Sequence, residues 1–233
     1  MNCKFCQNYE ISQLCKGNVI SSEKLAMEFL NLQERGANNI NLVTGAIYVP
    51  QIIESLKLAK EQGLKIPIIY NSSGYEKVET INMLNGYIDV YLPDLKYYYD
   101  SLAKELSGIN NYFEIATKAI KEMYNQVGNP KFNDKGIIQK GVIIRHLVLP
   151  NHLQNTKQIL KWIKKNMSKE VFVSVMAQYF PEYKALERDD INRKLTSEEY
   201  REIEAYVRKL GIENGYMQDI EDNEKKYVPN WNI

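Results

Sequence analysis

Hydrophobic and polar positions along the chain switch repeatedly between a helical period and short, nearly continuous apolar runs. Residues 21–36 carry apolar side chains at helical spacing between a serine N-cap, Ser21 or Ser22, and a terminating glycine, Gly36. The β-branched run at residues 40–43 follows at once and predicts a buried strand. This order of helix and strand then repeats along the chain.

The repeat predicts an α/β fold built on a parallel sheet, either doubly wound or barrel-like. The predicted strands cover residues 40–43, 66–71, 88–92, 142–148, 171–176 and a short last one near 216–218. The predicted helices cover residues 21–36, 50–63, 75–86, 112–127, 154–166 and 196–210. We expect residues 1–233 to form one domain, with residues 128–140 as an exposed excursion and residues 219–233 as a tail.

Charge and hydropathy exclude several classes of partner. The formal net charge is only +1, which provides no electrostatic basis for binding nucleic acid or an acidic membrane surface. No apolar run reaches the roughly 18 residues that a membrane span needs, and the start does not resemble a signal peptide. The sequence therefore predicts a cytoplasmic protein that binds neither nucleic acid nor membrane.

The chemistry begins at the N-terminus, in the string MNCKFCQNYEIS. Cys3 and Cys6 have the Cys-x-x-Cys spacing at which two thiolates can face one soft metal, as in zinc sites and iron-sulfur clusters. The alternative is that they are two ordinary thiols. The chain has three cysteines, all near one end, which is a poor disulfide framework and a better metal or redox cluster.

Several strings, in order along the chain, resemble the radical S-adenosylmethionine superfamily. These are CKFCQNYEIS, YNSSGYE, YLPDLKY, IIRHLVLP and SVMAQYFPEY. Within the superfamily, the sequence is most similar to homologues of pyruvate formate-lyase activating enzyme. The resemblance implies a partial (β/α)6-type barrel, a 4Fe-4S cluster and bound S-adenosylmethionine.

The resemblance also implies a cluster motif, Cys-x-x-x-Cys-x-x-Cys, of which Cys3 and Cys6 match the second and third cysteines. The first cysteine would fall two residues before Met1, so we expect a chain truncated at its N-terminus that lacks the first barrel strand. Cys15 does not fit the spacing and is interpreted as an ordinary cysteine.

Asp94 and Lys96 directly follow the predicted strand at residues 88–92. A lysine at the carboxyl end of a strand can pair with a ligand carboxylate, and an aspartate can hold its ammonium group in place or accept from an amine. By the resemblance, the lysine faces the carboxylate of S-adenosylmethionine. Without it, a solvated surface pair is the more frequent interpretation.

The other predicted cofactor ligands also lie on or just after strands. Asn71 and Ser73 can bind the amino acid or ribose part of the cofactor, or can form a plain helix-capping turn. Arg145 is a charge within an apolar strand, so we expect it to face a polar barrel interior and the cofactor. His146 points to the opposite face and is interpreted as structural.

Gln178 would line the same barrel mouth, whereas Met176 is expected to pack there. One string departs from the family: TGAIYVPQI has Ala46 and Ile47 where relatives commonly carry polar side chains. This departure affects the substrate side of the site rather than the fold.

Two functional hypotheses follow. The first is an enzyme that cleaves S-adenosylmethionine reductively to a 5′-deoxyadenosyl radical, which abstracts hydrogen from a glycyl-radical protein or a small molecule. The resemblance implies a flavodoxin- or ferredoxin-like electron donor for it. The second is a non-catalytic metal-binding or regulatory module that holds zinc or no metal, which the loss of the first cluster cysteine favours.

Overall fold

A computed structural model describes residues 1–218, and the predicted tail at residues 219–233 lies outside the described part. Six strands run parallel, and the seventh, β4, pairs antiparallel with β5. The strands are β1 (Ile40–Val43), β2 (Ile68–Ser72), β3 (Val90–Pro93), β4 (Lys131–Phe132), β5 (Ile138–Leu147), β6 (Phe172–Met176) and β7 (Gly215–Met217).

The parallel strands follow one another in space in the order β1-β2-β3-β5-β6-β7, which is also their order along the chain. This is the arrangement of a barrel wall that winds in one direction, and not the reversal found in a doubly wound sheet. The hydrogen-bonded path has two ends, β1 and β7, so the described strands form an open arc. The predicted α/β partial barrel is therefore confirmed.

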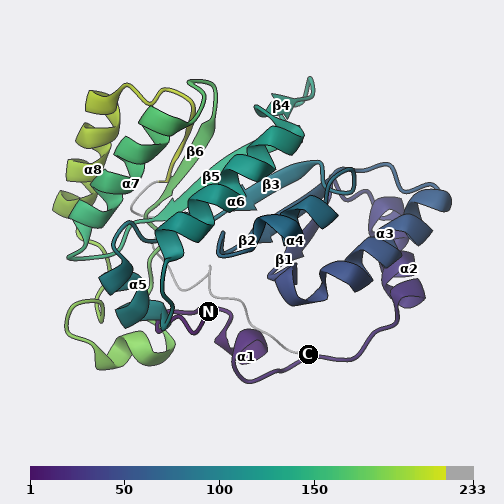
Figure 1. The fold of residues 1–233 in the computed structure, drawn as a ribbon, viewed down its shortest axis with the longest axis horizontal. Helices are drawn as coiled ribbons and strands as arrows, with labels where there is room; N and C mark the ends of the chain where they lie inside the picture. The colour runs from purple at the N-terminus through teal and green to yellow at the C-terminus, as the bar shows by residue number, and fades with distance from the viewer. Residues whose placement is uncertain (219–233) are drawn as a thin grey trace.

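Helices pack on one face of the arc, as Figure 1 shows for α4 and α6 in front of the central strands, α2 and α3 beside β1, and α7 and α8 beside β6. The α-helices are α1 (Tyr9–Ser12), α2 (Ser22–Glu34), α3 (Val49–Glu61), α4 (Val78–Met83), α5 (Asp100–Ser107), α6 (Tyr112–Val127), α7 (Leu153–Asn166) and α8 (Ser197–Leu210). Two 3-10 helices, η1 (Gly45–Tyr48) and η2 (Tyr183–Glu187), complete the elements.

Local chemistry explains where the helices begin. The Ser21 hydroxyl accepts from the Lys24 N–H at the start of α2, as the sequence predicts. Thr196 and Glu199 form a reciprocal capping box at the start of α8, which satisfies two N–H groups that the helix itself leaves unpaired. In both cases, a polar side chain fixes the first turn and so the direction in which the helix packs.

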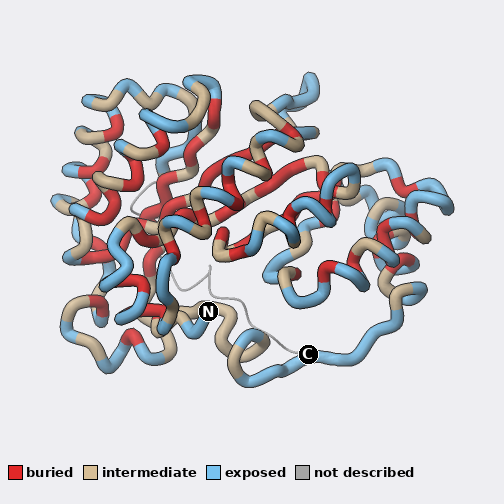
Figure 2. The backbone as a smooth tube through the Cα atoms, viewed as in Figure 1, coloured by how far each residue is buried: buried red, intermediate tan, exposed pale blue. Residues whose placement is uncertain are grey.

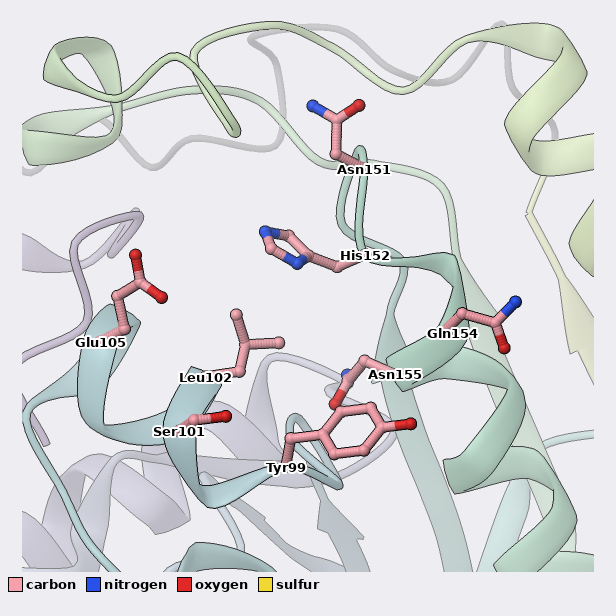
Figure 3. Close-up of a pocket in the computed structure, with 8 residues that line it drawn as sticks. All are labelled: Tyr99, Ser101, Leu102, Glu105, Asn151, His152, Gln154 and Asn155. Carbon is pink, nitrogen blue, oxygen red and sulfur yellow. The ribbon is translucent and has the colours of Figure 1, made fainter.

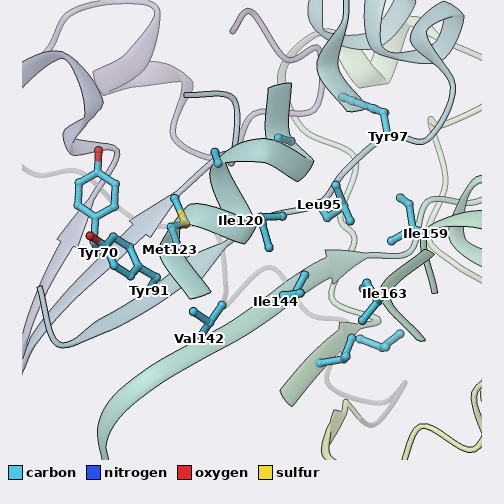
Figure 4. Packing of buried hydrophobic residues seen from close by; sticks show 14 of the residues in the cluster. Tyr70, Tyr91, Leu95, Tyr97, Ile120, Met123, Val142, Ile144, Ile159 and Ile163 are labelled. Carbon is cyan, nitrogen blue, oxygen red and sulfur yellow. The ribbon is translucent and has the colours of Figure 1, made fainter. Parts of the chain in front are cut away.

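The main core fills the space between the sheet and its helices. Figure 2 shows the buried positions concentrated in the strands and on the inner sides of the helices. Figure 4 shows Val142 and Ile144 of β5 packed near Ile120 and Met123 of α6. Since side chains alternate along a strand, the other face of the same strands is left free to carry polar groups.

One sequence prediction gains detail, and one helix was missed. The segment at residues 128–140 is an exposed excursion as predicted, with residues 131–136 exposed, and within it Lys131 pairs with Lys140 and Phe132 with Ile138 to extend β5 as a hairpin. Helix α5 was not predicted, although its Leu102, Ala103 and Leu106 are buried. The predicted strand near residues 216–218 is present as β7.

Candidate active site

The cysteine segment lies against the C-terminal end of α5. The Asn2 N–H donates to the Ser107 carbonyl at 3.0 Å, and the Lys4 N–H donates to the Leu106 carbonyl at 2.8 Å. A helix leaves its last carbonyls without partners inside the helix, and the incoming segment supplies partners for two of them. The N-terminal residues are thus fixed at a defined place on the fold (Figure 1).

Cys3 and Cys6 differ in their surroundings. The Cys3 sulfur accepts a hydrogen bond from the Ser107 hydroxyl at 3.0 Å, and the Cys6 sulfur lies 3.4 Å from the Ser12 hydroxyl. Burial raises the pKa of the Cys3 thiol, and the Lys96 ammonium and the Ser107 hydroxyl oppose this rise. Cys15, in contrast, is exposed.

A polar network lies at the carboxyl ends of β2, β3 and β5. The Lys96 ammonium lies 2.5 Å from one carboxylate oxygen of Asp94, and the Arg145 Nε lies 3.5 Å from the other. The Arg145 Nη1 donates to the Asn71 amide oxygen at 2.6 Å, and its Nη2 lies 3.6 Å from the Met176 sulfur. The structure therefore brings together Asn71, Asp94, Lys96 and Arg145 as the sequence predicts.

The charges of this network do not balance. Two cations, Lys96 and Arg145, face one carboxylate, Asp94. Burial opposes ionisation of Asp94, but Lys96 and Arg145 outweigh it and hold the pKa of the carboxyl below its usual range. Burial likewise opposes the charge of Lys96, but Asp94 and Cys3 outweigh it and raise the pKa of the ammonium group. The network carries a net positive charge, and the Asp94 Oδ1 atom has no hydrogen-bond partner.

Tyr112, at the start of α6, ties the strand ends together. Its hydroxyl accepts from the Lys96 N–H at 2.9 Å and shares its proton between the carbonyls of Ser73 and Asp94, each at 2.9 Å. The side chain is fully buried. The sequence analysis did not find Tyr112, because no spacing within the chain links a helix start to two separate strand ends.

Gly74 allows the same strand ends to approach each other. Its φ is +74°, and a Cβ atom there would overlap the carbonyl oxygen of Asp94. The preceding residue, Ser73, offers its carbonyl to Tyr112 and accepts at its hydroxyl from the Tyr75 N–H at 3.4 Å. The segment thus forms a turn and is tied to the network through Tyr112, and cofactor binding by Ser73 stays a prediction.

His146 and Gln178 form hydrogen bonds with groups other than the charged side chains of the network. The His146 ring is fully buried on the other face of β5, with Nδ1 2.6 Å from the Leu95 carbonyl and Nε2 2.9 Å from the Thr156 hydroxyl. Burial lowers the pKa of His146 to about 4. The Gln178 side chain accepts from Gln218 Nε2 at 2.8 Å, and so it is engaged with the chain after β7.

A pocket lies beside the network rather than in it. It has a volume of about 230 Å³ and lies between α5 and the turn that begins α7, with His152 and Glu105 among its lining residues (Figure 3). Asn155 lines this pocket and also bonds to the Lys96 carbonyl and the Tyr98 N–H. The pocket therefore shares a supporting side chain with the network but none of its charged groups.

The residues near the N-terminus fit an iron-sulfur cluster in part. Cys3 and Cys6 supply two thiolates at a spacing that such clusters use, close to a cationic group. Among residues 1–218, no group of three or more His, Cys, Asp or Glu side chains gathers closely enough to hold a metal ion. The described residues thus fit as two cluster ligands and supply no third.

Comparison with known proteins identifies the family. The model of the radical SAM superfamily matches residues 1–133, which is more than half of the chain. The chain belongs to the radical S-adenosylmethionine superfamily. Members of this superfamily use a 4Fe-4S cluster together with S-adenosylmethionine.

The chain also has a curated relative. The chain is 36% identical over 218 residues to an uncharacterised protein of Methanocaldococcus jannaschii, covering 91% of this chain and 60% of the relative. The chain thus spans about 60% of the length of the curated relative that it matches.

Solved structures of radical SAM enzymes share the fold. A domain of pyruvate-formate lyase-activating enzyme from Bacteroides vulgatus matches with a TM-score of 0.54 and 13% identity, over 78% of this chain and 98% of that one. SuiB from Streptococcus suis, bound to S-adenosylmethionine, matches with a TM-score of 0.58 and 15% identity, over 99% and 48% of the two chains. Coproporphyrinogen III oxidase from Escherichia coli matches with a TM-score of 0.57 and 12% identity, over 91% and 50%.

In the part of the chain that the structure describes, none of the helices combines the length and the apolar character that crossing a membrane requires.

Proposed function

We propose that this protein is a radical SAM enzyme of the activating-enzyme type, with Cys3 and Cys6 as two of its cluster ligands. The observation that carries the proposal is a chain of contacts from Cys3 to the strand-end network: the Cys3 sulfur accepts from the Ser107 hydroxyl, which lies 2.6 Å from the hydroxyl of Tyr97, the residue after Lys96. Sulfur ligands and a cationic site for an amino acid group thus lie at the same edge of the barrel. When bound, the cluster supplies the electron that cleaves S-adenosylmethionine to a 5′-deoxyadenosyl radical.

The network has the charges that the amino acid part of S-adenosylmethionine needs. A carboxylate placed beside Lys96 or Arg145 would neutralise the excess positive charge of the network. An ammonium group could donate to Asp94 Oδ1, the carboxylate oxygen that lacks a hydrogen bond. Asn71 holds Arg145 in place, and the Ser73 segment forms the neighbouring rim. These contacts bind and orient the cofactor, and none of them requires a proton transfer.

The substrate and the electron donor are further parts of the proposal. The likeness to activating enzymes suggests a glycyl-radical protein as the source of the abstracted hydrogen atom, with a small molecule as the other candidate. The electron would come from a flavodoxin- or ferredoxin-like protein, as for related radical enzymes. The compartment would be the cytoplasm.

Anaerobic reconstitution with iron and sulfide tests the cluster. The chain, its Cys3→Ser variant and its Cys15→Ser variant are assayed for iron, acid-labile sulfide and zinc. Electron paramagnetic resonance is recorded before and after S-adenosylmethionine is added. We expect a reducible cluster that S-adenosylmethionine perturbs, lost in Cys3→Ser and kept in Cys15→Ser, since Cys15 is exposed and remote in spacing.

A chain extended upstream to the next in-frame start is reconstituted in parallel. A cluster in the extended chain alone would place the further ligand in the added residues and keep the proposal. Absence of any cluster in both chains would refute it.

Affinity for S-adenosylmethionine tests the network independently of turnover. Lys96→Met should weaken binding measured by calorimetry about 10-fold or more, because one of two cations for the ligand carboxylate is lost. Lys65→Met is the matched control, since Lys65 is exposed and outside the network. Equal affinities in the two variants would contradict the assignment of Lys96.

One observation favours the second candidate, a zinc-binding or regulatory module. The described residues offer only two thiols near each other, with no third ligand beside them. Zinc found at one equivalent per chain, with no iron-sulfur cluster after reconstitution, would support the module and exclude the enzyme.

A further inference from the structure

Helix α5 contributes more to the cysteine segment than backbone contacts. Beyond the bonds from Asn2 and Lys4 to its last carbonyls, it places the Ser107 hydroxyl 3.0 Å from the Cys3 sulfur. Ser107 is fully buried, and it is the last residue of the helix before Gly108, whose φ of +66° ends the helical path. The hydroxyl position is therefore fixed by the helix and not by a mobile loop.

A second hydroxyl lies next to the Ser107 hydroxyl. The Tyr97 hydroxyl lies 2.6 Å from the Ser107 oxygen, and Tyr97 is also fully buried. A serine hydroxyl has one proton, so when Ser107 donates to the sulfur it must accept from Tyr97. The three groups then form a chain in which Tyr97 donates to Ser107 and Ser107 donates to Cys3.

We propose that Ser107, supported by Tyr97, is the positioning residue that holds the Cys3 sulfur ready to bind a soft metal. The identity of the metal in this inference rests on the proposed function. The test below does not, because it uses another metal. A sulfur ligand binds metal as a thiolate, and a buried thiolate needs donors to replace lost water. Hydrogen bonds to ligand sulfurs also influence the reduction potential of iron-sulfur clusters.

Cobalt(II) binding to the metal-free chain tests the proposal without an iron-sulfur cluster. All variants carry Cys15→Ser so that only Cys3 and Cys6 remain as thiols. The near-ultraviolet thiolate-to-metal absorption is titrated with cobalt(II) in the parent chain, Ser107→Ala, Tyr97→Phe and Ser101→Ala. Ser101 lies on the first turn of the same helix, six residues before Ser107, and serves as the matched control.

We expect Ser107→Ala to weaken cobalt(II) binding about 10-fold, the scale seen for lost partners of metal ligands, and Tyr97→Phe to weaken it less. Ser101→Ala should bind like the parent. Circular dichroism checks that each variant folds. If Ser107→Ala does not fold, the cobalt(II) affinity of Tyr97→Phe, which keeps the serine, tests the proposal instead. Equal affinities in all four chains, or no thiolate absorption in the parent, would overturn the proposal.

The reconstituted cluster provides the second measurement. A donor to a ligand sulfur stabilises the more negative, reduced state, so Ser107→Ala should shift the reduction potential to more negative values. If neither the parent chain nor the upstream-extended chain forms an iron-sulfur cluster but Ser107→Ala still weakens cobalt(II) binding, the proposed function fails and the role of Ser107 stands. If the cluster forms with one potential in all four chains and cobalt(II) affinities are equal, the proposed function stands and the role of Ser107 fails.

Discussion

Replacement of Tyr112 by phenylalanine removes one oxygen atom from the centre of the candidate site and leaves the ring in place. In the native chain this oxygen accepts from the Lys96 N–H and shares its proton between the Ser73 and Asp94 carbonyls. Two net hydrogen bonds at about 1 kcal/mol each are lost, and the buried Lys96 N–H is left unpaired. We expect the free energy of unfolding to fall by about 3 kcal/mol.

Urea denaturation of the metal-free chain, followed by circular dichroism, measures this change. Tyr124→Phe is the matched control, because Tyr124 lies on the same helix and its hydroxyl makes one half-buried bond, 2.7 Å to Asn129 Oδ1. That variant should lose about 1 kcal/mol or less. If the two variants lost equal stability, Tyr112 could not be the residue that ties the strand ends together.

Three further predictions concern groups around the site. Burial lowers the pKa of His146 to about 4 in the folded chain, whereas an ordinary histidine has a pKa of about 6.5. Between these pH values the unfolded chain binds more protons than the folded chain, so the free energy of unfolding should fall by up to about 3 kcal/mol from pH 6.5 to 4. His146→Gln should flatten this slope in urea midpoints measured across that range. The Arg193 hydrogen bond lowers the pKa of Glu199 to about 2. Glu199→Gln should therefore lower the free energy of unfolding by about 1–2 kcal/mol at pH 7, a range that allows for solvent screening of the partly exposed Arg193. Near pH 2 the same change should cost nearly nothing. Gly74→Ala should cost about 3 kcal/mol or more in thermal unfolding because its Cβ would overlap a carbonyl, whereas Gly63→Ala, with positive φ but open space, should cost only about 1–2 kcal/mol.

The fold could be predicted from sequence because each strand is a short apolar run enclosed by strong helix signals. Observed boundaries differ by a few residues, and the largest difference is at β5, which begins at Ile138 because β4 pairs with it. That pairing depends on a contact across a turn and leaves no hydrophobic pattern, since Lys131 and Phe132 are exposed. The family grouping followed from ordered strings and needed no geometry.

The sequence could predict the site residues that lie at strand ends, but not those that lie on helices. Asn71, Asp94 and Arg145 lie on or just after neighbouring parallel strands, so their common edge follows from the topology. Ser107 and Tyr112 belong to helices, and their contacts with Cys3 and Lys96 depend on how those helices dock. Gln178 lies at the expected strand end, but its partner Gln218, after β7, could not be foreseen from the pattern.

The strand-end network is a costly way to stabilise a fold, and this cost is itself informative. Removing Lys96 and Asp94 from water incurs a desolvation penalty that their attraction often fails to recover, and apolar residues of similar volume can stabilise such sites better. The network also carries a carboxylate oxygen, Asp94 Oδ1, that accepts no hydrogen bond, and one excess positive charge. Both features are unfavourable in the free chain, and both would be relieved by a ligand that carries a carboxylate and an ammonium group. This cost is the reason for which we propose that the arrangement binds an amino acid group, which agrees with the cofactor that this superfamily uses.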